Sequence, residues 1–204
     1  AALDRPDLTE PGVARELAGG LPADATLFVA ASMPIRDVEA FAPVRTPALR
    51  VLINRGANGI DGTIATAYGA AAASDGPVVL LLGDVAFAHD AGSLLVARRI
   101  GVPLTIVLVD NAGGGIFDFL PIAGERDLFE THVATPTGLD VAGVAAAYGL
   151  HHLPVTTMEE LQAAVGHGIS SAGTTLVHVR TDRPANLALH RALSDAVAAA
   201  LGDG

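Results

Sequence analysis

The sequence predicts an α/β fold built on a doubly wound, mostly parallel sheet with helices on both faces. Short apolar runs alternate along the chain with segments of helix-like spacing, which is the pattern of successive β–α–β units. Two consecutive apolar runs end in Gly83-Asp84 and in Asp110-Asn111, so short oxygen-bearing side chains follow two strand ends. Ligands of open parallel sheets bind at such ends, and we therefore expect the functional site there.

The N-terminal part of the chain predicts two helices and two strands. Apolar residues at helical spacing predict a helix within 1–21, and short apolar runs predict buried strands at 26–30 and 49–53. Pro34 suits the first turn of the second helix, for which Ser32 is a candidate N-cap. This order of elements is the beginning of a doubly wound sheet.

Two more helices are expected around the first of the two oxygen-bearing strand ends. Small residues over 63–73 predict a helix that can pack closely on the sheet, and Asp61 is the residue that we expect to cap it. A longer helix is expected over 86–100, because two parallel strands that end in Asp84 and Asp110 need a crossover connection between them.

The C-terminal part continues the alternation after an irregular stretch. The segment 118–135 is mixed, with proline, glycine and charged residues, and predicts a mobile loop that could cover the site. Asp140 or Thr137 should begin the helix that follows, and Gly149 should cap its end. The remaining helices and strands are expected at 139–148, 152–155, 158–169, 174–180 and 186–201.

Composition narrows the class of protein. The 204 residues carry a formal net charge of −10 and no basic cluster, so nucleic acid is not an expected partner. The chain has no cysteine, which excludes disulfides and thiolate zinc sites. No apolar run approaches membrane-spanning length, and the first residues lack a signal-peptide pattern. We expect a cytoplasmic enzyme, whose acidic surface can still bind an anionic diphosphate if a cation bridges the charges.

The two strand ends carry the chemistry of a metal–diphosphate site. Asp84 offers a carboxylate oxygen and Asn111 an amide oxygen, and the glycines at 113–115 let a backbone carbonyl turn toward the same point. Three such oxygens suit Mg²⁺, which would complete its shell with phosphate oxygens and water. The helix that opens near Val85 and Ala86 would aim free N–H groups at those phosphates.

The pair Gly83-Asp84 and Asn111 resembles the diphosphate-binding motif of thiamine diphosphate (ThDP) enzymes. The resemblance implies that the side chains of Asp84 and Asn111 and the carbonyl of Gly113 hold Mg²⁺, with Mn²⁺ as an alternative. Val85 and Asp110 depart from the residues that many members carry, but neither position supplies a metal ligand. The residues implied around the cofactor are Gly83, Asp84, Val85, Ala86, Asn111, Gly113, Gly114, Gly115 and Ile116.

Four stretches resemble one branch of that family more closely, the carboligases of menaquinone biosynthesis. These stretches are S-x-x-x-R at 32–36, NRGANGIDG at 54–62, GDVAFAHD at 83–90 and GGGIF at 113–117. The resemblance implies that the carboxylates of two substrates, 2-oxoglutarate and isochorismate, meet Ser32, Arg36 and Arg55. Arginine suits this role, because its guanidinium binds a carboxylate with two hydrogen bonds and stays protonated.

The resemblance also implies roles for three apolar residues. Ile60 would lie beneath the thiazolium ring and hold the cofactor bent, so that its amino group reaches the reactive carbon. Ile116 and Phe117 would form the apolar side of the site. From the residues alone other roles stay open: Arg36 and Arg55 as surface charges, the loop that holds Ile60 as plain turn chemistry, and Ile60 itself as a core residue.

The resemblance covers residues 1–204, which we interpret as a single diphosphate-binding domain and as the C-terminal part of a larger enzyme. In the family a glutamate on a separate pyrimidine-binding domain, usually from a partner subunit, activates the cofactor. We therefore expect a homo-oligomeric full-length enzyme and an isolated chain that is inactive. Two alternatives remain: another ThDP-dependent decarboxylase or acetolactate-type synthase, and a non-catalytic module that binds a nucleotide, a regulator or another subunit.

Overall fold

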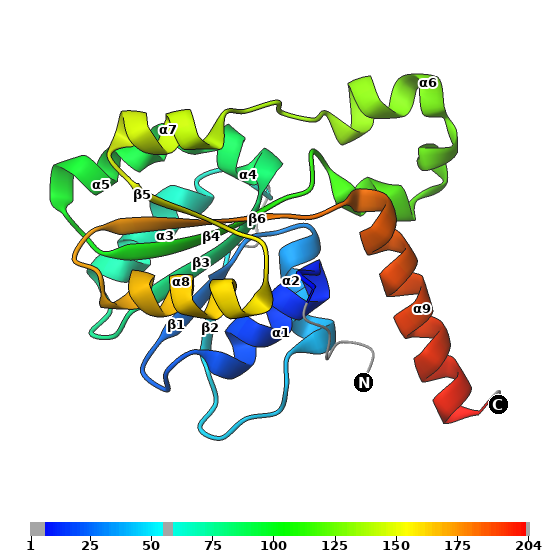
Figure 1. Ribbon diagram of the computed structural model, residues 1–204, viewed down its shortest axis with the longest axis horizontal. Coiled ribbons are helices and arrows are strands. Elements are labelled where there is room, and N and C mark those ends of the chain that lie inside the picture. Colours follow the sequence, from blue (N-terminus) through cyan, green and yellow to red (C-terminus); the bar gives the residue numbers. More distant parts are fainter. Residues whose placement is uncertain (1–6, 55–58, 203–204) are drawn as a thin grey trace.

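A parallel six-stranded sheet forms the centre of the molecule (Figure 1). The computed structural model describes residues 7–54 and 59–202. The strand order is β2-β1-β3-β4-β6-β5, and every pairing in it is parallel. The strands are β1 (Thr26–Val29), β2 (Arg50–Ile53), β3 (Val78–Gly83), β4 (Leu104–Asp110), β5 (His151–Val155) and β6 (Thr174–Arg180).

Helices cover both faces of this sheet, which confirms the predicted doubly wound fold (Figure 1). One face packs on the helices α1 (Glu10–Gly20), α2 (Met33–Phe41) and α8 (Met158–Ser170). The other face packs on α3 (Thr63–Ala72), α4 (Asp84–His89), η1 (Ala91–Leu94), α5 (Leu95–Ile100) and α7 (Val141–Tyr148).

The central strands are apolar along their whole length because both of their faces are buried. In β3, Leu81 belongs to the cluster under α1 and α8, whereas its neighbours Leu80 and Leu82 belong to the cluster under α3 and α7. Successive side chains of a strand point to opposite faces, so a strand covered on both sides needs apolar residues at every position. This requirement explains the unbroken run V-V-L-L-L that ends at the functional site.

The winding of the chain reverses at β1. From β1 the chain crosses through α2 to β2 on one side, then returns through α3 to β3 on the other side. The strands β1 and β3 are therefore the neighbours between which a crevice opens at the carboxyl ends. Those ends lead into Ser32 and Asp84, and the end of β4 leads into Asn111. The topology thus brings three distant stretches of the sequence to one edge of the sheet.

The single helix expected over 86–100 is wrong, since the structure divides this stretch into α4, η1 and α5. The break follows Asp90, whose Oδ2 accepts hydrogen bonds from the backbone N–H groups of Ile64 (2.6 Å) and Ala65 (3.1 Å). Asp90 therefore caps the N-terminus of α3. The sequence predicted this role for Asp61. Asp61 instead contacts the imidazole of His89.

Asp140 and Gly149 bound α7 as predicted, whereas two other helices start at residues different from the predicted ones. Asp140 caps α7 by accepting from the N–H of Gly143, and Gly149 ends this helix with φ of 71°. The first described helix begins only at Glu10, because Thr9 caps it. The last helix, α9 (Arg183–Leu201), begins three residues before the expected start at 186, because Asp182 accepts from the N–H of Ala185.

The segment expected as an irregular loop at 118–135 is instead a series of short helices. They are η2 (Gly115–Phe119), η3 (Pro121–Gly124), α6 (Arg126–Phe129) and η4 (Glu130–Ala134). Arg183, at the start of α9, forms ion pairs with two residues of this segment. Its guanidinium lies 2.7 Å from a carboxylate oxygen of Glu130 and 3.7 Å from one of Asp118. These ion pairs fix both ends of the segment to the body of the domain.

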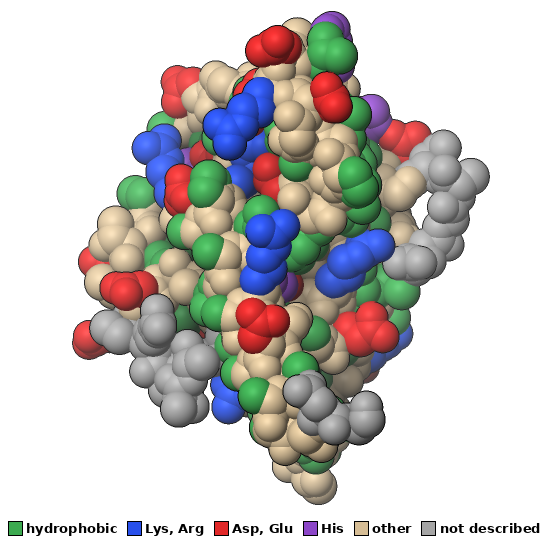
Figure 2. All heavy atoms as spheres, turned by 90° about the vertical axis from the view of Figure 1, so that its right-hand side faces the viewer, with side chains coloured by type: hydrophobic (Ala, Val, Ile, Leu, Met, Phe, Trp, Pro, Cys, Tyr) green, Lys and Arg blue, Asp and Glu red, His purple; other side chains and the backbone are tan. Residues whose placement is uncertain are grey.

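The helix α9 projects from the sheet along one side of the molecule (Figure 1). Figure 2 shows this side, where hydrophobic side chains gather along the helix among scattered charged ones. Val197 and Leu201, in the last turns, are 59% and 81% exposed. A groove of about 1210 Å³ lies between α9, α2 and η2. No helix in the described part of the chain has the length and apolar character needed to cross a membrane.

Candidate functional site

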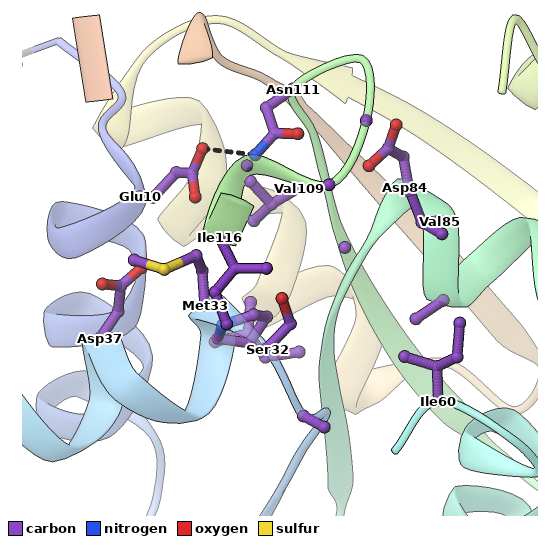
Figure 3. Close-up of a pocket in the computed structure, with 18 of the residues that line it drawn as sticks. Glu10, Ser32, Met33, Asp37, Ile60, Asp84, Val85, Val109, Asn111 and Ile116 are labelled. Atoms are coloured by element: carbon purple, nitrogen blue, oxygen red, sulfur yellow. Dashed lines mark hydrogen bonds between the residues drawn. The ribbon is translucent and has the colours of Figure 1, made fainter. Parts of the chain in front are cut away.

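A cavity of about 300 Å³ opens at the carboxyl ends of β1, β3 and β4 (Figure 3). Among the described residues, all of the site residues predicted from the sequence line it, except Arg36. The structure adds two buried carboxylic acids to its wall, Glu10 and Asp37, which the sequence analysis missed. The cavity therefore combines acidic and amide oxygens with an apolar wall.

Asp84 is the buried acid at the centre of this site. It follows β3 directly and its side chain is 5% exposed. Burial, together with the nearby Asp110 carboxylate, raises the pKa of Asp84 to about 6, although backbone N–H groups of Gly113 and Val85 partly oppose this. Its Oδ2 atom is buried and has no hydrogen-bond partner among the described residues. A buried carboxylate oxygen without a partner is unfavourable, unless a cation or a donor reaches it.

Asn111 presents a second unpartnered oxygen to the same place. Its Nδ2 donates a hydrogen bond of 2.8 Å to Oε1 of Glu10, whereas its buried Oδ1 has no partner in the described part of the chain. Figure 3 shows the amide nitrogen directed at Glu10 and the amide oxygen directed toward Asp84. Two unpartnered oxygens, one of them acidic, that face a common point fit a divalent cation.

The glycines after Asn111 are required by the shape of the loop. Gly113 has φ of 134°, and a Cβ atom there would lie 2.6 Å from the carbonyl oxygen of Ala134. A Cβ on Gly115 would lie 2.8 Å from Nδ2 of Asn111. The carbonyl oxygen of Gly113 accepts from the N–H of Gly115 (2.9 Å), which leaves its second lone pair for a cation. The loop therefore fits the three-oxygen set expected from the sequence.

Within the described residues, no three His, Cys, Asp or Glu side chains gather at metal-binding spacing. A cation at this site would therefore depend on one carboxylate, one amide and one backbone carbonyl. Such a set carries a single negative charge, so the affinity for the cation should rise when an anionic ligand supplies further oxygens.

The apolar wall accounts for Ile60 and corrects the role of Ser32. The sequence left open whether Ile60 is a core residue or lines a pocket. In the structure it does both, because it packs on the core beneath α3 and also lines the cavity. Ser32 also lines the cavity and stands at the N-cap position of α2, as predicted, but its side chain makes no capping hydrogen bond. Its φ of 76° lies in the left-handed region that serine rarely adopts. Ile116 and Phe117 complete the wall from η2.

Of the two predicted substrate arginines, the structure places only Arg36, and it lies outside the cavity. The guanidinium of Arg36 donates a hydrogen bond of 2.7 Å to the carbonyl oxygen of Ser32. Arg36 is exposed and lines the groove along α9 rather than the cavity. Arg55 falls outside the described residues. Arg36 therefore supports the backbone of Ser32, at the rim between the cavity and the groove.

Asp37 and His190 form a buried ion pair next to the cavity, which the sequence did not predict. Asp37, 2% exposed, lies 2.7 Å from Nε2 of His190 on α9. Burial raises the pKa of Asp37 even though His190 opposes the rise. For His190, burial lowers the pKa, but hydrogen bonds to Asp37 and to the carbonyl of Asn186 outweigh it and raise the value. No local pattern could reveal this pair, because its members are 153 residues apart.

The raised pKa of Asp84 predicts a pH dependence of stability in the metal-free chain. Its folded-state value of about 6 exceeds the ordinary 3.8, so the folded chain binds this proton more tightly than the unfolded chain. The resulting stability is present below pH 3.8 and is lost as the pH rises through 6. Relative to Asp84→Asn, the free energy of unfolding should fall by about 2 kcal/mol between pH 4 and pH 7.

Urea denaturation in EDTA at several pH values would measure this difference, with Asp75→Asn as the control. Asp75 is exposed and precedes β3 at the opposite end of the strand. A difference between the wild-type chain and Asp84→Asn that stays constant with pH would contradict the expected proton linkage.

Residues 38–179 match the family model of the thiamine pyrophosphate enzyme, C-terminal TPP binding domain. The chain belongs to this family, as the motif of Asp84 and Asn111 predicted. A relative from Myxococcus xanthus, named 2-succinyl-5-enolpyruvyl-6-hydroxy-3-cyclohexene-1-carboxylate synthase, is 52% identical over 100% of this chain and 35% of its own length. A relative of the same name from Rubrobacter xylanophilus is 45% identical over 95% of this chain and 33% of its own.

The name of these relatives is that of the menaquinone-pathway branch which the four sequence stretches resemble. The chain spans about a third of the length of the curated relatives that it matches. The fold is also that of an X-ray structure from Mycobacterium smegmatis, assigned as a thiamin diphosphate-dependent enzyme, with a TM-score of 0.67 and 22% identity. That likeness covers 88% of this chain and 33% of the solved chain.

Proposed function

We propose that this chain is the metal–diphosphate-binding part of a synthase that decarboxylates 2-oxoglutarate and adds the succinyl semialdehyde unit to isochorismate. The observation that carries the proposal is the pair of buried, unpartnered oxygens, Asp84 Oδ2 and Asn111 Oδ1, beside a glycine loop. The name shared by the relatives from Myxococcus xanthus and Rubrobacter xylanophilus supports the choice of reaction. Among divalent cations Mg²⁺ is the first candidate, because these ligands are hard oxygens and leave positions for phosphate and water.

Each part of the cavity has a role in this proposal. The side chains of Asp84 and Asn111 and the carbonyl of Gly113 would hold Mg²⁺ against the diphosphate. When bound, ThDP supplies the chemistry of decarboxylation and of carbon–carbon bond formation. The protein residues bind and orient it: Ile60 would support the thiazolium ring, and Ile116 with Phe117 would keep water from it.

The substrates would approach from the rim of the cavity. Ser32 lines the cavity and Arg36 lies one helical turn away, so together they could bind a substrate carboxylate. We assign Arg55 to the same role from the resemblance of its loop. The remainder of such an enzyme would supply the pyrimidine-binding domain from a partner subunit, and it would need a surface on this domain. The apolar groove along α9 offers one, since it adjoins the cavity at Met33, Ile116 and Phe117.

Product analysis by mass spectrometry of the full-length protein tests the reaction directly. With 2-oxoglutarate and isochorismate, it should form the adduct and release CO₂, whereas the isolated chain should form no product. Turnover of pyruvate in place of 2-oxoglutarate would favour an acetolactate-type synthase instead. Absence of turnover with any 2-oxoacid, despite bound ThDP, would favour a non-catalytic module.

The two arginines give a separate prediction about substrate binding. Replacing Arg36 or Arg55 by alanine should lower kcat/KM for the dicarboxylate substrates by about 10- to 100-fold, because each change removes a charge-assisted hydrogen bond. ThDP affinity should stay unchanged. Steady-state kinetics of the full-length enzyme would measure this, with Arg191→Ala, an exposed arginine of α9, as the control. Kinetics equal to the wild type for both variants would remove these residues from the substrate site.

A further inference from the structure

Glu10 has an unusual position for a residue in the first turn of a helix. Its side chain is only 5% exposed and lies in the wall of the cavity. One oxygen, Oε1, accepts two hydrogen bonds, from Nδ2 of Asn111 (2.8 Å) and from the hydroxyl of Thr181 (3.0 Å). These contacts join the start of α1 to the ends of β4 and β6, from partners 101 and 171 residues away.

The contact with Glu10 decides which end of the Asn111 amide faces the site. An amide has a donor end and an acceptor end of almost the same shape, so packing alone does not distinguish them. With Nδ2 on Glu10, the acceptor Oδ1 is left pointing at Asp84, as Figure 3 shows. The reversed amide would place Oδ1 against the Glu10 carboxylate and would turn two N–H donors toward the cation.

We propose that Glu10 is the positioning residue of the metal site, which fixes the Asn111 amide with its oxygen toward the cation. The inference rests on the proposed function, because it assigns Oδ1 of Asn111 to the metal. It also explains why position 111 carries asparagine although aspartate would bind Mg²⁺ more strongly. An aspartate there would place an oxygen where Nδ2 now lies, 2.8 Å from the carboxylate of Glu10.

Calorimetric titration of the full-length protein with ThDP, at fixed Mg²⁺ and then in EDTA, provides the readout. Glu10→Leu removes the acceptor and should weaken Mg²⁺-dependent ThDP binding by about 10- to 100-fold, the usual effect of losing a partner that orients a metal ligand. Glu10→Gln keeps an acceptor oxygen and should bind within about threefold of the wild type. Glu16→Gln, further along α1, is the matched control and should bind as the wild type does.

A double substitution tests the orientation independently of any loss of packing. Asn111→Asp alone should weaken binding at least about tenfold, because two carboxylates then face each other. Glu10→Gln added to Asn111→Asp should restore most of that loss, since the new amide can donate to the new carboxylate. These changes keep the size of both side chains, so they decide the question even if Glu10→Leu does not fold.

Three results would overturn the inference and leave the proposed function intact. They are wild-type binding by a folded Glu10→Leu, a loss with Glu10→Gln as large as with Glu10→Leu, and effects of Glu10→Gln and Asn111→Asp that simply multiply. Failure of the wild-type protein to bind ThDP with Mg²⁺ is a different outcome. It would overturn the proposed function, and the inference would fall with it.

Discussion

Replacing Asp84 by alanine should abolish the Mg²⁺-dependent binding of ThDP by the full-length protein. Asp84 supplies the single carboxylate among the three proposed metal ligands, and its Oδ2 is buried without another partner among the described residues. Without it, none of the three proposed ligands would carry a negative charge to hold the cation that joins the diphosphate to the protein. We expect a loss of at least about 100-fold in affinity, which corresponds to roughly 3 kcal/mol.

The same change should leave the metal-free fold intact. Because a buried carboxylate with one unpartnered oxygen is unfavourable in the folded state, Asp84→Ala should not lower the melting temperature in EDTA. Asp75→Ala, before the other end of β3, is the control and should change neither quantity. ThDP affinity in Asp84→Ala equal to that of the wild type, measured by calorimetry with Mg²⁺, would show that the cation does not bind at Asp84.

Replacing Gly113 by alanine should damage both the loop and the binding of ThDP. The new Cβ atom would lie 2.6 Å from the carbonyl oxygen of Ala134, and the residue would need φ of 134°, which alanine rarely adopts. The loop would have to move away from η4, and the Gly113 backbone, whose N–H group lies against the Asp84 carboxylate, would move with it. We expect a loss of about 2–4 kcal/mol in stability and at least a tenfold loss in ThDP affinity.

Gly138→Ala separates the two causes of this loss. Gly138 also has a positive φ, of 59°, but nothing lies within 4 Å of its expected Cβ position. Alanine at 138 should cost about 1 kcal/mol and leave ThDP binding unchanged. Denaturant unfolding and calorimetry on both variants would measure the comparison. Equal stability losses at the two positions would contradict a role for the contact with Ala134.

The sequence predicted the parts of the site that depend on local pattern. Asp84 and Asn111 each follow an apolar strand, and parallel strands end at the same edge of a sheet, so their meeting was predictable. The glycine loop was predictable for the same reason, because its conformation is a property of residues 113–115 themselves. The position of Ile60 in the cavity wall followed from the resemblance of its loop to a known motif.

The sequence failed where distant residues determine the structure. Glu10 resembles an ordinary acidic residue in a first helical turn, and only the packing of α1 beside β4 brings it to Asn111. Asp90 interrupts a helix that its neighbours favour, because its carboxylate caps α3 instead. The segment 118–135 lacks helical periodicity, yet it folds into short helices that Arg183 anchors through Glu130. These contacts join residues too far apart in sequence for a local pattern to show them.

A crystal structure of the full-length protein with ThDP and Mn²⁺ tests the central claim most directly. Anomalous scattering locates Mn²⁺ without any assumption about its ligands. We predict one peak at about 2 Å from Oδ2 of Asp84, from Oδ1 of Asn111 and from the carbonyl oxygen of Gly113, with diphosphate oxygens in the remaining positions. A peak at other residues, or ThDP bound with its diphosphate away from the Gly113 loop, would contradict the account.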